Sequence, residues 1–201
     1  MKLIIGSLLL ILSAQANAIL LSVDFISSGD GLLTRDTDTG LEWLDLTATS
    51  NASINDVLNG YGDFISSGFR YASIDELTTL YTNAEIVNLT GSFVPANWQG
   101  ANQLISLMGM TDIRGEFRWS EGFVGLNEPS NGAAYRASVV SRTTYSQGAG
   151  VNLPGPVVTF DTFGDGAGSY LVRSISVPEP TSLALLGLGL AGISIARHRK
   201  A

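Results

Sequence analysis

The chain has 201 residues, of which 45% are hydrophobic and 14% are charged, and this length allows one domain of ordinary size with additional segments. It has no cysteine, which excludes disulfide bonds, thiolate zinc sites and thiol nucleophiles. Between residues 19 and 177 there are seven arginines, no lysine and 17 acidic residues, and this net charge of −10 argues against binding to nucleic acid or to anionic membranes.

The first 18 residues have the composition of a secretory signal peptide. Lys2 supplies a positive charge, an apolar segment follows over residues 3–12, and Ala16-Asn17-Ala18 matches an A-x-A cleavage site. The apolar segment is shorter than the ~20 residues that a transmembrane helix needs. We therefore predict cleavage that depends on Ala16 and Ala18, export by the secretion machinery, and an exported chain that begins near Ile19.

Residues 19–176 are expected to form one exported domain. The pattern predicts a strand over 20–25 and a hairpin whose strands, 32–36 and 41–46, flank the turn Thr37-Asp38-Thr39-Gly40. Apolar residues at helical spacing after Ser53 predict a helix over 54–65. A short strand at 69–73 follows, and Ser73 with Glu76 forms a capping box that begins a second helix.

The second half of the domain is predicted to be rich in strands. A third helix is expected over 98–110, and the predicted strands are 116–120, 133–143, 156–161 and 169–176. This order predicts an α+β fold, a single domain of antiparallel strands with about three helices, in which the first and last strands pair. We expect an N-terminal signal helix and a C-terminal membrane helix to flank it.

Residues 177–201 form a separate segment. Pro178-Glu179-Pro180 precedes an uncharged apolar stretch over 183–196, and the chain ends with the basic tip Arg197-His198-Arg199-Lys200, which contains the only histidine. A helix over the apolar stretch would be about 21 Å long, which is short of the ~30 Å hydrocarbon core of a bilayer. The basic tip would stay on the cytoplasmic side.

These features resemble the PEP-CTERM sorting signal of Gram-negative bacteria. The resemblance implies that a membrane-embedded exosortase recognises Pro178, Glu179 and Pro180 and processes the tail, and that the positively charged residues Arg197, Arg199 and Lys200 form the end of the signal. It also implies a setting of exopolysaccharide or biofilm production. The chain would cross the inner membrane, be anchored transiently by its C-terminus, and then reach the cell surface or the extracellular matrix.

Part of the core carries a second resemblance. Asp36-x-x-Thr39-Gly40-Leu41-Glu42-Trp43 and the segments 68–77, 117–120 and 170–173 are similar to the Lcl C-terminal domain family, although Ser73 replaces a proline of that family. The resemblance implies a C-type-lectin-like fold. It transfers no function to the core, because one fold hosts many functions.

The core offers few groups for catalysis. It has no histidine and no cysteine, so Ser-His-Asp and Cys-His arrangements are excluded, and it has no phosphate-binding G-x-x-x-x-G-K-[ST] loop. Two carboxylate pairs remain that could serve the hydrolysis of a glycosidic bond, Asp75/Glu76 and Glu116/Glu121, and helix capping explains the first pair. We predict no enzymatic activity, no catalytic residue and no bound cofactor.

Calcium is the one ion that the sequence suggests. Residues 36–42 combine acids with a glycine, but Gly40 stands one position earlier than the glycine of an EF-hand loop, and a hairpin turn explains the same residues. Residues 118–132 loosely resemble the sugar-binding loop of C-type lectins. On that resemblance Glu128 and Asn131 are candidate calcium or glycan ligands, and the alternative is an exposed turn.

The sequence therefore supports two hypotheses. The first is a non-enzymatic exported surface or extracellular-matrix protein, sorted by exosortase and associated with exopolysaccharide or biofilm. Its partners would be exosortase, the secretion machinery, the membrane and extracellular polysaccharide. The alternative is a calcium-dependent glycan-binding module.

Overall fold

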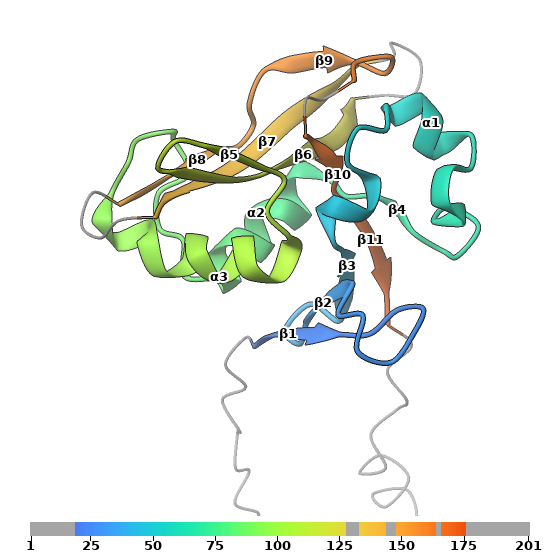
Figure 1. Cartoon of the computed structure of the whole chain (residues 1–201), viewed down its shortest axis with the longest axis horizontal. Coiled ribbons are helices and arrows are strands. Elements are labelled where there is room, and N and C mark those ends of the chain that lie inside the picture. The colour runs from blue at the N-terminus through green and yellow to red at the C-terminus, as the bar shows by residue number, and fades with distance from the viewer. Residues whose placement is uncertain (1–18, 128–132, 144–147, 164–165, 176–201) are drawn as a thin grey trace, which may run out of the picture.

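The structure is a computed structural model that describes residues 19–127, 133–143, 148–163 and 166–175 (Figure 1). Its elements in chain order are β1 (Leu20–Val23), β2 (Leu33–Asp36), β3 (Leu41–Leu44), the 3-10 turn η1 (Leu46–Thr49), α1 (Ile54–Leu58), η2 (Tyr61–Asp63), β4 (Arg70–Tyr71), α2 (Ile74–Asn83), η3 (Pro95–Asn97), α3 (Trp98–Met108), β5 (Asp112–Arg114), β6 (Phe117–Asn127), β7 (Ala133–Arg142), β8 (Ala149–Asn152), β9 (Val157–Thr159), β10 (Gly168–Ser169) and β11 (Leu171–Ser174). The α+β prediction is confirmed.

The described strands form two sheets. The first has the order β1-β2-β3-β11-β4, and the second has the order β10-β6-β7-β8, with β5 paired to β6 and β9 paired to β7. Strand β10 runs parallel to β6, and the other paired strands of the described chain are antiparallel. Figure 1 shows α2 and α3 on one side of the second sheet, and it shows β1 and the end of β11 at the end of the domain farthest from β9.

Two apolar clusters form the core. In the first, Trp43 from β3 packs with residues of α2, α3 and the second sheet, including Leu80, Leu104 and Val139. The second cluster joins residues of the first sheet, α1 and the second sheet and includes Leu44, Phe64, Phe69 and Phe123. Trp43 has no exposed surface and is thus a core residue.

Local sequence explains where the helices begin and where the first one ends. Ser53 and Ser73 each form a capping box, with the carboxylates of Asp56 and Glu76 respectively, as the sequence predicted for the second helix. The predicted helix over 54–65 is too long, because α1 ends at Leu58. Gly60 and Gly62 both have positive φ angles, which interrupt a right-handed helix.

The pairing of the terminal strands differs from the prediction. Strand β11 pairs with β3 and β4, whereas β1 pairs with β2 and therefore lies two strands away from β11. Strands β5 and β8 were not predicted, and β6 extends to Asn127 instead of ending at 120.

The described residues include no helix that is long and apolar enough to span a bilayer. The predicted signal peptide over 1–18, the sorting segment over 177–201 and its apolar helix over 183–196 lie outside the described residues.

Gly100→Ala is expected to destabilise the core, although alanine is the better helix former by about 1 kcal/mol. A Cβ at position 100 of α3 would overlap the backbone oxygen of Ala84, which cannot move independently of its chain. Overpacking of this kind costs ~1–3 kcal/mol. Denaturant unfolding of Gly100→Ala should therefore show a lower midpoint than wild type, and the exposed neighbour Gln99→Ala serves as the control on the same helix. A midpoint for Gly100→Ala at or above that of the control would contradict the expected clash.

Candidate functional site

The chain leaves the described core from a strand that is fixed in the first sheet. In β11, Val172 is paired with Trp43 of β3, and Ser174 is paired with Leu41. The N–H of Ile175 then donates to the carbonyl oxygen of Gly40 at 2.9 Å. The sheet therefore holds the chain up to residue 175.

A buried ion cluster fastens β11 to its neighbours. Arg173 donates from Nε to Glu42 Oε2 at 2.9 Å, and Arg35 of β2 donates from Nη2 to Glu42 Oε1 at 2.6 Å. The Glu42 side chain is only 6% exposed. Burial alone would raise the pKa of Glu42, but the hydrogen bonds from Arg35 and Arg173 outweigh burial and lower this pKa.

The same arginine also covers two aromatic rings. The Arg173 guanidinium carbon lies 5.0 Å from the ring centroid of Phe25 and 4.7 Å from that of Phe69. The two rings pack edge to face with centroids 5.4 Å apart. These cation–π contacts add to the ion pairs, and together they tie the last strand to three other parts of the chain.

The hairpin turn beside this strand is organised by Asp36. The buried carboxylate accepts hydrogen bonds from the N–H groups of Asp38 and Thr39 and from Asn83 Nδ2 of α2. The hairpin predicted from Thr37-Asp38-Thr39-Gly40 is confirmed, with Gly40 at a φ of 67°. The carboxylates of Asp36 and Glu42 are thus occupied by the turn and by the arginines, whereas the side chain of Asp38 is exposed.

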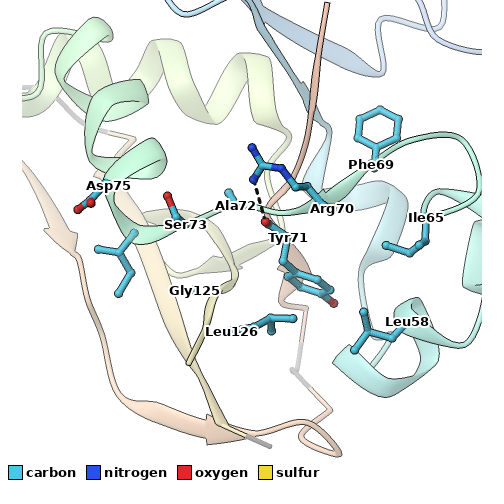
Figure 2. Close-up of a pocket in the computed structure, with 11 residues that line it drawn as sticks. Leu58, Ile65, Phe69, Arg70, Tyr71, Ala72, Ser73, Asp75, Gly125 and Leu126 are labelled. Atoms are coloured by element: carbon cyan, nitrogen blue, oxygen red, sulfur yellow. Dashed lines mark hydrogen bonds between the residues drawn. The ribbon is translucent and has the colours of Figure 1, made fainter. Parts of the chain in front are cut away.

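A pocket of about 520 Å³ lies at the N-terminus of α2 (Figure 2). Its lining residues are Leu58, Ile65, Phe69, Arg70, Tyr71, Ala72, Ser73, Ile74, Asp75, Gly125 and Leu126. Two polar side chains of its wall have partners outside the lining. Arg70 pairs with Glu76 at 2.5 Å, and the Tyr71 hydroxyl lies 2.9 Å from Ser169 Oγ.

The pKa values of Glu76, the partner of Arg70, and of Tyr71 follow from their surroundings. The hydrogen bond from Arg70 lowers the pKa of Glu76 to about 2. Burial raises the pKa of the Tyr71 hydroxyl above its ordinary value. Neither group is therefore poised to exchange a proton near neutral pH.

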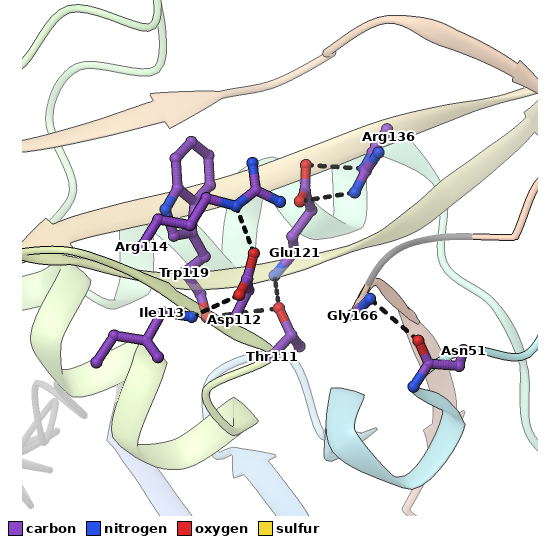
Figure 3. A network of polar contacts seen from close by, with 9 residues as sticks. All are labelled: Asn51, Thr111, Asp112, Ile113, Arg114, Trp119, Glu121, Arg136 and Gly166. Atoms are coloured by element: carbon purple, nitrogen blue, oxygen red, sulfur yellow. Dashed lines mark hydrogen bonds and ion pairs between the residues drawn. The ribbon is translucent and has the colours of Figure 1, made fainter.

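The proposed pair Glu116/Glu121 lies beside arginines of β7. Glu121 is held by Arg136, with Nε 2.8 Å from Oε1 and Nη2 donating to Oε2 at 2.9 Å (Figure 3). Glu116 faces Arg142 at 3.6 Å. Each carboxylate therefore has its own positive partner.

The strand β5 adds a second charged pair to this region (Figure 3). Asp112 Oδ2 accepts from Arg114 Nε at 2.5 Å, and the Arg114 guanidinium carbon lies 5.3 Å from the ring centroid of Trp119. Thr111 Oγ1 accepts from the N–H of Glu121 at 3.1 Å. These contacts explain the arrangement as internal support for the edge of the second sheet.

The predicted site residues lie outside the described part of the chain. These are Ala16 and Ala18, the candidate metal ligands Glu128 and Asn131, the motif Pro178, Glu179 and Pro180, and the basic residues Arg197, Arg199 and Lys200. Within the described ranges, no group of three or more His, Cys, Asp or Glu side chains is placed to hold a metal ion.

Sequence reasoning missed the cluster around Glu42. The pair of Arg35 and Glu42 could have been predicted from the sequence, because a hairpin that turns over 37–40 places Arg35 opposite Glu42. The contact between Arg173 and Glu42 could not have been predicted, because the two residues are 131 positions apart in the chain.

Comparison with protein-family models matches residues 176–200 to the PEP-CTERM protein-sorting motif. A search of curated proteins and a search of solved structures each return no match. The C-type-lectin-like resemblance of the core therefore has no support from these comparisons and stays a prediction. The matched motif implies that the chain is exported and that an exosortase sorts and processes it.

Proposed function

We propose that this chain is a non-enzymatic surface or extracellular-matrix protein that is associated with exopolysaccharide or biofilm after exosortase sorting. The observation that carries the proposal is the sorting motif over residues 176–200. The motif directly follows a strand that the core holds firmly. Such an arrangement suits a protein whose folded part is delivered intact while its tail is processed.

The composition of the core supports the non-enzymatic part of the proposal. Residues 19–177 have no histidine, cysteine or lysine, three side chains that often act as nucleophiles or bases near neutral pH. The carboxylates of Glu42, Glu76 and Glu121 are all paired with arginines. Their role in the fold is structural.

Processing of the tail is expected only where exosortase is present. Intact-mass analysis of the native protein, from matched strains with and without the enzyme, should show loss of the C-terminal segment in the first strain alone. Replacing Pro178, Glu179 and Pro180 by alanine should abolish that loss, and Ser182→Ala, just outside the triplet, should not. Equal masses in the two strains would refute sorting by this route.

The calcium-dependent glycan-binding alternative depends on Glu128 and Asn131, whose support is the sequence resemblance. Calorimetry of the purified exported protein with calcium, followed by a glycan array, separates the two proposals. Heat of calcium binding that Glu128→Gln abolishes, together with calcium-dependent glycan capture, would favour the alternative. Absence of both would leave the first proposal.

A further inference from the structure

The last residue that the folded core holds is only a few positions before the Pro-Glu-Pro triplet. Ile175 still donates to Gly40 O, and Pro178 begins the Pro-Glu-Pro triplet. A trans chain advances by at most ~3.3–3.6 Å per residue, so the Cα atoms of Ile175 and Pro178 are no more than about 11 Å apart. An enzyme that binds the triplet must therefore approach the surface of the core.

The core does not readily release strand β11. Leu171 and Val172 are fully buried, and Arg173 is held by Glu42 and by the rings of Phe25 and Phe69. Releasing β11 to lengthen the accessible chain would expose these apolar side chains and leave Glu42 with one partner. The folded protein therefore fixes the point, at Ile175, where the chain leaves the core.

The surface at that place is the exit turn, which we define as residues 37–40 together with Ile19. The side chains of Thr37, Asp38 and Thr39 are exposed. Ile19 joins the turn through two hydrogen bonds, because its N–H donates to Thr37 Oγ1 and its carbonyl oxygen accepts from the N–H of Thr37. Its side chain is 53% exposed.

We propose that exosortase contacts the folded core at the exit turn when it takes the sorting motif. The occupant of this surface follows from where the described chain ends, since the Pro-Glu-Pro triplet begins three residues after Ile175. The inference rests on the proposed sorting function and adds a second contact to it. Recognition then involves the core as well as the tail. The spacer between them, residues 176–177, limits the distance between the two contacts.

A double-mutant design tests this contact in the full-length protein. The first change is Asp38→Arg, which replaces a short exposed acid of the exit turn by a long cation. The second is an insertion of about 12 Gly and Ser residues after Ser176, which gives a mean reach of about 20 Å. Asp75→Arg, the same change at an exposed acid on α2, is the matched control.

The rate of tail removal is followed by intact mass in cells that contain the enzyme. Asp38→Arg is expected to change this rate by about fivefold with the native spacer, as for a contributing interface residue, and by less than about twofold in the inserted chain, because the two sites are then uncoupled. Asp75→Arg should match wild type in both.

Two results would overturn the contact and leave sorting intact. One is an Asp38→Arg rate equal to wild type with the native spacer, and the other is the same change of rate with and without the insertion. If the wild-type tail is not removed at all, the proposed sorting function itself fails. Equal melting temperatures of the variants exclude an effect through unfolding.

Discussion

Glu42→Gln is expected to lower the free energy of unfolding by about 3 kcal/mol, near the low end for breaking a buried ion pair. The substitution keeps the size of the side chain but removes the charge that compensates both Arg35 and Arg173. Arg35 is 40% exposed and keeps part of its hydration, which moderates the cost. Urea unfolding of the exported protein, followed by circular dichroism, measures the difference.

Glu116→Gln is the matched control for Glu42→Gln. Glu116 also faces an arginine, but at 3.6 Å and with 44% of its side chain exposed. Pairs of this kind contribute ~0–1 kcal/mol. If the two variants lose the same stability, the buried cluster does not fasten β11 as we infer.

Local signals in the sequence predict the elements that depend on neighbouring residues. The turn Thr37-Asp38-Thr39-Gly40 defines the hairpin, because Gly40 supplies the positive φ and Asp36 bonds to the turn amides. Ser73 and Glu76 similarly define the start of α2. These interactions span only three or four residues, so the pattern contains all that is needed.

The sheet order could not be predicted in this way. Strand β11 pairs with β3 on one side and with β4 on the other, and the amphipathic pattern of a strand does not specify its partners. The short strand β5 was missed because it has three residues, two of them charged. The extent of α1 was overestimated because apolar spacing continues past Gly60, where the backbone cannot remain helical.

The same limit applies to the candidate site. The sorting motif is a contiguous pattern and is readable in the sequence. The cluster that fastens β11, the strand before the motif, joins Arg35, Glu42, Phe69 and Arg173, which come from four separate segments. Its existence follows from the topology, so the way in which β11 is fastened became clear only from the structure.

The stability of the core is expected to be constant across neutral pH and to fall at both extremes. Residues 19–177 have no histidine, cysteine or lysine side chain to titrate in between. Hydrogen bonds from Arg70 lower the pKa of Glu76 to about 2, and the pKa of Glu42 is also lowered. A carboxyl group whose pKa is lowered in the folded state stabilises the protein at pH values above its ordinary pKa. This stability is lost as the pH falls from about 4.5 toward 2.

The alkaline side has the opposite sign of shift. Burial raises the pKa of the hydroxyl groups of Tyr71, Tyr81 and Tyr170. A tyrosine hydroxyl whose pKa is raised in the folded state stabilises the protein at pH values below its ordinary pKa of ~10. This stability is lost as the pH rises above that value. Urea midpoints measured from about pH 2 to 12 should therefore form a plateau with two falling flanks.

Two variants assign the flanks to these groups. Glu76→Gln should make the acid flank shallower and leave the alkaline flank unchanged, because it removes one carboxylate with a lowered pKa. Tyr81→Phe should make the alkaline flank shallower and leave the acid flank unchanged, since the Tyr81 hydroxyl is buried and lies 2.8 Å from that of Tyr170. A midpoint at pH 3 equal to that at pH 7 would show that the arginine-paired carboxylates do not carry the acid dependence. A change of both flanks in either variant would mean that the two groups of residues are not independent.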